Sequence, residues 1–347
     1  MNLKSINALG LISGTSMDGI DCSLIKTNGI NFKRANKNIV IPYSKKTSQL
    51  LDIIINKPMQ YINNLQNKDK LEALITNDHI NAVNMFRKKY NDNIEIVGFH
   101  GQTILHQPKS KTSIQIGDGK KLANKIGLDV ISNFREYDII NGGQGAPLAP
   151  VFHQAIMKQE NIKLPACFIN IGGVSNLTWW NGKSTIAFDT GPGNGLIDTF
   201  FQKKLNLKYD NNGYIARKGN PNYIIINKIL NDNYFKLNPP KSIDRLHFNK
   251  ILNLISFNKL NFEDAVATLA CLTVQTIIKG YEYFVKPPNT TVIMGGGQHN
   301  KFIVSKLKEK IINNVFTANE IKLPGDFIEA ELIAFIAVRR LYNLPIT

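Results

Sequence analysis

A chain of 347 residues, of which 43% are hydrophobic, exceeds what a single core comfortably supports, so two domains are expected. The longest apolar run of the chain is far shorter than the roughly 18 residues of a membrane span, so we expect no membrane partner. The sequence does not begin with a basic segment followed by an apolar one, so we expect a cytoplasmic protein. The formal net charge is +16, but the lysines are spread without the aromatic interleaving of a nucleic-acid surface, so we expect no nucleic-acid partner and an anionic substrate.

The first half of the chain begins with strands and continues into helices. Apolar alternation predicts strands over residues 6–13, 20–28 and 30–43, and the turn GTSMDG joins the first two. Leucine and isoleucine recur at helical spacing from about residue 45 to 90. The remaining elements expected here are strands over 94–99 and 128–134, a strand ending in a turn over 112–119, and a short helix over 120–127.

The pattern restarts in the second half. Residues 165–194 read as strand, Gly-Gly turn, strand, Asn-Gly turn and strand, followed by a glycine-rich loop that opens a helix. Residues 290–311 read as a strand, a triple glycine and an amphipathic helix, and residues 327–342 as a long apolar helix.

Glycine-rich hairpin tips therefore begin at Gly14 and at Gly172, one in each half of the chain. We predict an α/β protein of two related lobes, each a mixed sheet with helices, with a cleft between them. The expected lobes are residues 1–135 and 136–347, with the terminal helix able to pack back on the first lobe.

The first tip is a candidate phosphate-binding loop. Backbone amides of Gly14, Thr15, Ser16 and Gly19 can converge on phosphate oxygens, and Asp18 can hold a water of phosphate-bound Mg²⁺. It is not a Walker-type loop, because no lysine and no helix follow. A polar turn explains the same residues equally well when the stretch is taken alone.

Two further glycine motifs favour a nucleotide site. The second tip, GGVSN at residues 172–176, can clamp a polyphosphate opposite the first. The triple glycine Gly295–Gly297 follows a buried strand and lets a planar group approach the backbone. Each motif alone is also explained as a tight turn or as a loop before a helix.

Three other stretches carry side chains suited to catalysis or substrate binding. In FDTGPGN, Asp189 ends a predicted strand and can act as a general base, although a turn or helix cap is its commoner role. Arg135 can hold a substrate carboxylate, or pair with Glu136 or Asp138. HGQT at residues 100–103 offers donors and acceptors for sugar hydroxyls.

Metal and disulfide chemistry have little support. His100 and His106 have no third partner at a spacing suited to zinc. Cys22, Cys167 and Cys271 are odd in number and widely separated, so they are expected as buried free thiols.

Taken together, these motifs resemble the anhydro-N-acetylmuramic acid kinases, a family of the actin/hexokinase/Hsp70-like, ribonuclease H-like superfamily. The resemblance runs nearly end to end. It rests on the blocks GLISGTSMDGID, GFHGQTILHQP, IQIGDG, DVISNFREYDIINGGQGAPLAPVFH, NIGGVSNLT, FDTGPGNGLID, PPKS, GGG and FIEAELIAFIAVR.

The resemblance implies an ATP-dependent sugar kinase of peptidoglycan recycling that requires Mg²⁺ and forms a homodimer. It implies that water opens the 1,6-anhydro ring while O6 is phosphorylated, with Asp189 as the catalytic base. The implied ATP-binding residues are Gly14, Thr15, Ser16, Met17, Asp18, Gly19, Ile20, Asp21, Gly172, Gly173, Asn176, Gly295, Gly296 and Gly297. The implied substrate-binding residues are His100, Gly101, Gln102, Thr103, Arg135, Gly191, Gly193, Asn194 and Glu329.

Two segments depart from the family pattern. After PPKS the chain has IDRLHF, beginning with Ile243–Leu246, where the family usually has a Thr-Gly-Arg-Glu run. Met294 stands where cysteine is common, and Gln298 and His299 follow the triple glycine. We expect the first departure to alter local packing or the dimer surface and the second to alter the adenine pocket, with neither contacting Asp189.

Two other functions would fit much of this sequence. A kinase for another small sugar would share the fold and the nucleotide site. A nucleotide-regulated binding protein of the actin or chaperone type would hydrolyse ATP slowly, whatever sugar is present.

Overall fold

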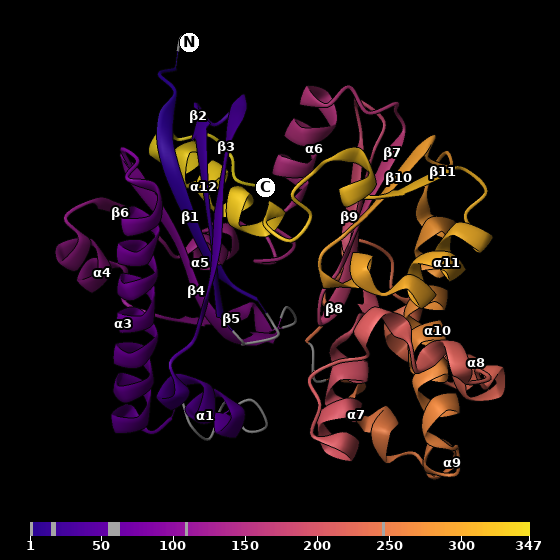
Figure 1. Ribbon diagram of the computed structural model, residues 1–347. Coiled ribbons are helices and arrows are strands. Elements are labelled where there is room, and N and C mark those ends of the chain that lie inside the picture. The colour runs from indigo at the N-terminus through magenta and orange to yellow at the C-terminus, as the bar shows by residue number, and fades with distance from the viewer. Residues whose placement is uncertain (1–2, 15–18, 55–62, 108–109, 245–246) are drawn as a thin grey trace. The chain divides into compact units, whose positions relative to one another are not determined.

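A computed structural model describes residues 3–14, 19–54, 63–107, 110–244 and 247–347 (Figure 1). The chain divides into two units, Met1–Gln159 with Phe327–Thr347, and Glu160–Asp326. The boundary expected after residue 135 is therefore placed too early. Residues 136–159 belong to the first unit because α5 (Phe134–Ile140) is continuous across residue 135 and α6 (Pro150–Gln159) contacts the C-terminal helix of that unit.

The first unit is built on a mixed sheet with the strand order β3-β2-β1-β4-β5, and β6 pairs with β4. β1, β2 and β3 form an antiparallel meander, and β4 lies parallel to β1. The strands are β1 (Ile6–Ser13), β2 (Gly19–Thr27), β3 (Phe32–Pro42), β4 (Ile96–Gln107), β5 (Thr112–Ile116) and β6 (Asp129–Ile131). Its other helices are α1 (Lys45–Ile54), α3 (Leu65–Tyr90), α4 (Gly119–Ile126) and α12 (Ile328–Leu341).

The C-terminal helix α12 packs directly on the glycines of this sheet. Gly10 of β1 and Gly98 of β4 are partners in the parallel ladder. A Cβ atom at Gly10 would lie 1.8 Å from the carbonyl oxygen of Ala330, and one at Gly98 would lie 2.5 Å from that of Ile333. These two glycines therefore let the helix backbone approach the sheet, and α12 joins the first unit despite its place at the end of the chain.

The second unit repeats the meander and the parallel fourth strand on another mixed sheet, with the order β11-β10-β7-β8-β9. β7, β8 and β9 form an antiparallel meander, and β10 lies parallel to β7. The strands are β7 (Ala166–Ile171), β8 (Val174–Trp180), β9 (Thr185–Pro192), β10 (Thr290–Met294) and β11 (Asn314–Thr317). The helices are α7 (Gly195–Leu205), α8 (Tyr223–Leu230), α9 (Ile255–Asn258), α10 (Phe262–Gly280) and α11 (Lys301–Lys310).

The repeat of architecture predicted from the two hairpin tips is thus present in the topology of the two sheets. Two local expectations differ from the structure. The strand expected over 128–134 shortens to β6, and Arg135 lies in the first turn of α5. Helix α10 is not predicted by the sequence pattern, because it is buried on nearly all sides and so lacks a polar face.

The three cysteines are buried and free, as expected. Among the described residues, every helix falls short of the length or hydrophobicity needed to cross a bilayer.

Candidate active site

Asp189 lies near the end of β9, where it is 7% exposed. One segment, residues 234–243, binds its polar groups at three points. The Asp189 amide donates to the carbonyl of Lys241 at 3.0 Å, and the Asp189 carbonyl accepts from the hydroxyl of Tyr234. The amide of Ile243 donates to the Asp189 carboxylate at Oδ2, at 2.9 Å. Both the backbone and the side chain of Asp189 are therefore held in one orientation.

The second hairpin tip meets the loop that follows Asp189. The amide of Asn194 donates to the carbonyl of Gly172 at 2.7 Å, and the amides of Gly193 and Gly195 donate to the carbonyl of Gly173 at 3.1 Å each. A Cβ atom at Gly193 would lie 2.3 Å from the Gly172 oxygen, so this close approach needs glycine. Two motifs separated along the chain thus form one structure at the end of the second sheet.

The triple glycine joins the same end of that sheet. Gly295 has a φ of 71°, and a Cβ there would lie 2.3 Å from Oδ1 of Asn170. A Cβ at Gly297 would lie 2.4 Å from Cβ of Ile171, so this glycine packs against the end of β7. Gly296 has more room, because the nearest atom to its Cβ position is Nδ2 of Asn194 at 3.7 Å.

A pocket of about 430 Å³ lies within the second unit, between the start of α7, residues 209–212 and the segment that follows the triple glycine. This volume falls in the range of ordinary small-molecule sites. Most of its lining residues carry polar side chains, and Gly296 adds no side chain to it. The lining residues are Asn194, Ile197, Asp198, Tyr209, Asp210, Asn211, Asn212, Gly296, His299 and Asn300.

Asn176 carries an unsatisfied polar atom beside Asp189. The two residues are partners in the ladder between β8 and β9. The Oδ1 atom of Asn176 is buried and has no hydrogen-bond partner among the described residues. A buried acceptor left unpaired is costly, which suggests that a bound group satisfies it.

In the first unit, His100 and Arg135 come together from β4 and α5. Nε of Arg135 donates to Nε2 of His100 at 3.0 Å, and Nδ1 of His100 donates to the carbonyl of Gly101 at 2.9 Å. Burial and the nearby Arg135 lower the pKa of His100 to about 3, so the ring is neutral and accepts from the guanidinium. His106, whose pKa burial and Arg135 lower to about 4, is a second neutral ring near the same cation.

Gln102 is fully buried, and both ends of its amide are used within the protein. Its Oε1 accepts from the Tyr43 hydroxyl at 3.2 Å, and its Nε2 donates to the carbonyls of Gly14 and Thr103 at 3.2 Å each. The side chain thus supports the start of the first tip, and its expected contact with the sugar stays a prediction.

The remaining predicted site residues of the first unit lie on the first tip and at the start of α12. Thr15, Ser16, Met17 and Asp18 lie outside the described residues. Ile20 is buried in the core of the first unit, which leaves its main chain for ligand contacts. Glu329 is exposed in the first turn of α12. Among the described residues, no three His, Cys, Asp or Glu side chains group in a way that could hold a metal ion.

The sequence profile of the anhydro-N-acetylmuramic acid kinases matches residues 6–347. The chain belongs to the anhydro-N-acetylmuramic acid kinase family.

Relatives of that name match over almost their whole length. The anhydro-N-acetylmuramic acid kinase of Zymomonas mobilis is 35% identical over 98% of this chain and 94% of its own. That of Pelagibacter ubique is 35% identical over 97% of this chain and 92% of its own. Among solved structures, component A of the (R)-2-hydroxyglutaryl-CoA dehydratase of Acidaminococcus fermentans aligns over 97% of this chain and 99% of its own, at 11% identity and a TM-score of 0.51. That likeness concerns the fold alone.

One expectation about how this chain departs from the family pattern is wrong. The segment beginning at Ile243 was expected not to contact Asp189, yet the Ile243 amide binds its carboxylate. The contact is made by the backbone, which every residue except proline can provide, so the change of side chain does not remove it. In the other departure His299 lines the pocket, whereas Met294 and Gln298 are buried, and an effect on an adenine pocket stays a prediction.

Proposed function

We propose that the chain phosphorylates O6 of 1,6-anhydro-N-acetylmuramic acid with ATP while water opens the anhydro ring. The products are N-acetylmuramic acid 6-phosphate and ADP, in peptidoglycan recycling. The observation that carries the proposal is the meeting of the GGVSN, FDTGPGN and GGG loops at one end of the second sheet, with Asn194 and Gly296 of these loops lining a pocket. Family membership supplies the substrate class.

Asp189 acts as the base in this reaction. It takes a proton from water as the water oxygen bonds to the anomeric carbon, and the bond from that carbon to O6 breaks. O6 then bonds to the γ-phosphorus, and ADP leaves. The Ile243 amide orients the Asp189 carboxylate before the substrate arrives, so little reorganisation is needed during the reaction.

The pocket is proposed to take the adenosine moiety, and the glycine loops the phosphates. Gly172, Gly173 and Gly296 carry no side chain that would block a bulky anion, which supports this assignment. Mg²⁺ would neutralise charge on the β- and γ-phosphates, as in other phosphoryl transfers. Gly14 to Asp21 are proposed as further phosphate contacts, with Asp18 touching the ion through water.

In the first unit, Arg135 is proposed to bind the lactyl carboxylate of the sugar, with His100 as the acceptor that orients it. A planar guanidinium matches a carboxylate with two parallel hydrogen bonds, which suits this substrate. Thr103, Gly191, Gly193, Asn194 and Glu329 are proposed as additional sugar contacts. We further propose a cytoplasmic homodimer.

The test is a reaction of the purified protein with Mg-ATP and the anhydro-sugar in ¹⁸O-labelled water, analysed by mass spectrometry. We expect the 6-phosphate with one solvent oxygen at the anomeric carbon. A product whose oxygens all come from the substrate would reject the ring-opening reaction. Equal turnover of anhydro-sugars that lack the lactyl group would reject the substrate assignment.

A further inference from the structure

Lys241 lies in a setting that the proposed reaction does not explain. The residue is 7% exposed, which is rare for lysine. The ammonium lies over three aromatic rings, at 5.5 Å from the ring centre of Phe188, 5.1 Å from that of Tyr234 and 4.9 Å from that of Tyr283. Such an aromatic enclosure favours the charged form of an amine.

The Lys241 ammonium also links two parts of the 234–243 segment, which holds Asp189. Nζ of Lys241 donates to the carbonyl of Leu237 at 2.8 Å and to that of Tyr234 at 3.5 Å. The hydroxyl of Tyr283, 3.4 Å from Nζ, donates to the same Leu237 carbonyl at 2.9 Å. The buried ammonium of Lys241 thus closes residues 234–241 into a loop, and both ends of this loop contact Asp189.

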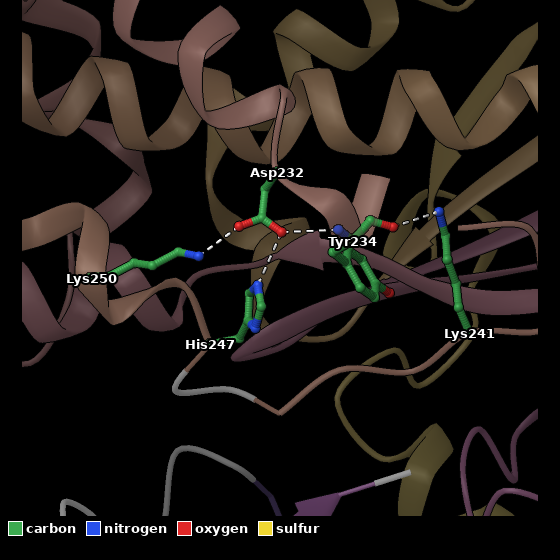
Figure 2. Close-up of polar contacts among 5 residues, drawn as sticks. All are labelled: Asp232, Tyr234, Lys241, His247 and Lys250. Carbon is green, nitrogen blue, oxygen red and sulfur yellow. Dashed lines mark hydrogen bonds and ion pairs between the residues drawn. The ribbon is translucent and has the colours of Figure 1, made fainter. Parts of the chain in front are cut away.

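The far side of this loop is fixed by an ion cluster (Figure 2). Asp232 accepts from the amide of Tyr234 at 2.9 Å, from Nζ of Lys250 at 2.6 Å and from Nε2 of His247 at 3.2 Å. Figure 2 shows Asp232 reaching the amide of Tyr234 while Lys241 reaches its carbonyl from the other side. Tyr234 is therefore held at both main-chain polar groups.

Tyr234 itself transmits this restraint to Asp189. Burial and the neighbouring Asp189 raise the pKa of the Tyr234 phenol, so its hydroxyl keeps the proton that it donates to the Asp189 carbonyl. The backbone of Lys241 accepts from the Asp189 amide, and two residues later Ile243 donates to its carboxylate. Two of the contacts on Asp189 thus come from the ends of the loop that the Lys241 ammonium closes, and the third comes from Ile243, two residues beyond it.

We propose that Lys241 is a positioning residue whose charged side chain holds the 234–243 loop so that Ile243 aims the Asp189 carboxylate at its target. The inference rests on the proposed function, because it assigns Lys241 a part in the work of the base Asp189. Lys241 touches neither substrate nor nucleotide in this role.

The charge of Lys241 gives the role a pH signature. Burial, and next the positive charge of Lys279 on α10, lower the pKa of Lys241 to about 8. The other groups that face it are the neutral hydroxyls of Tyr234 and Tyr283, while Glu282 pairs with Lys279 at 3.7 Å. As the pH rises through about 8 the ammonium loses its charge, so the loop loosens and kcat falls.

The experiment compares three variants with the wild type across pH 6 to 10, with kcat and KM for ATP measured separately. For Lys241→Met we expect kcat to fall about ten- to a hundredfold at pH 7 and the decline near pH 8 to disappear, with KM for ATP little changed. Lys241→Arg keeps a charge at every pH in this range, so its activity should show no decline near pH 8. Lys279→Met removes the like charge that lowers the pKa of Lys241. The fall of kcat should therefore move to higher pH, with kcat at pH 7 unchanged.

Lys241→Met with wild-type kcat and an unchanged pH profile would overturn the proposal. If that variant does not fold, as judged by circular dichroism, an unmoved pH profile in Lys279→Met would overturn it instead. Failure of the proposed function is distinguishable, because it would appear as full activity in Asp189→Asn or as no sugar kinase activity in the wild type.

Discussion

At the scale of single residues, the chain uses uncharged groups to orient charged side chains. Asp189 is oriented by the Ile243 amide, and the Arg135 guanidinium by a neutral His100 ring. In both pairs the orienting group comes from a different element and carries no charge of its own. The Asp189 carboxylate and the Arg135 guanidinium therefore keep their charges while the neighbouring groups fix their orientations.

Asp189→Asn tests the base. An amide cannot accept the proton of water, so we expect kcat to fall by about 10²- to 10⁴-fold, in the range for lost general-base catalysis. Nucleotide affinity, measured by calorimetry with ADP, should stay at the wild-type level because the pocket is built from other residues. The matched control is Asp129→Asn, an exposed aspartate of β6 whose loss should leave kcat unaltered. Normal turnover in Asp189→Asn would mean that another group is the base.

His100→Ala tests the orientation of Arg135. Without the acceptor at 3.0 Å the guanidinium loses its direction, so we expect KM for the sugar to rise about tenfold, equivalent to about 1.4 kcal/mol. KM for ATP should not change. Arg135→Lys serves as the comparison, since it keeps the charge and removes the fork, and should raise KM for the sugar at least as much. An unaltered sugar KM in both variants would remove these residues from the substrate site.

At the scale of elements, the sequence predicts correctly those strands and helices whose hydrophobic pattern is clear within a short stretch. The strands expected over 6–13, 20–28 and 30–43 correspond to β1, β2 and β3, because one face of each is apolar and turns separate them. Residues 262–280 went unpredicted because a helix buried all round has no polar face to mark its period. The packing of α12 on β1 depends on contacts between chain ends, which no local pattern contains.

Gly98→Ala and Gly10→Ala test that packing. Each added Cβ would lie within 2.5 Å of a helix carbonyl, so the helix must shift, and we expect each variant to lose about 2–3 kcal/mol in free energy of unfolding. Urea denaturation followed by circular dichroism measures the loss. Gly127→Ala is the control, because its Cβ would meet nothing within 4 Å and only its positive φ of 67° costs stability, about 1 kcal/mol. Losses no larger than in this control would show that α12 does not press on these glycines.

At the scale of the whole molecule, buried histidines are distributed unevenly. His79, His100, His106 and His153 are all buried in the first unit, and burial is the main cause that lowers each pKa from 6.5 to between about 3 and about 4. In the second unit, His247 and His299 are exposed. Both tryptophans of the chain, Trp179 and Trp180, lie in the second unit.

Acid should therefore destabilise the first unit before the second. Between pH 6.5 and about 4 the unfolded chain binds protons that the folded one excludes, so stability falls as the pH falls. Each fully titrating histidine contributes about 1.4 kcal/mol per pH unit in this window. We expect far-ultraviolet circular dichroism to change at a higher pH than tryptophan fluorescence, which reports only the second unit. His79→Phe should move the first change to lower pH, and coincident changes in the two signals would contradict the expectation.

By itself, the sequence determined the fold class, the repeated hairpin architecture and the positions of the glycine loops, because period, turn chemistry and glycine requirements are local and leave marks in short stretches. Only the tertiary structure decided where the first unit ends, that Gln102 supports the first tip, and that the 234–243 loop holds Asp189. The physical reason is the distance along the chain. The hydrogen bonds from Tyr234 and Ile243 to Asp189 span 45 and 54 residues. Such contacts exist only once the two strands and the loop have been brought together by folding.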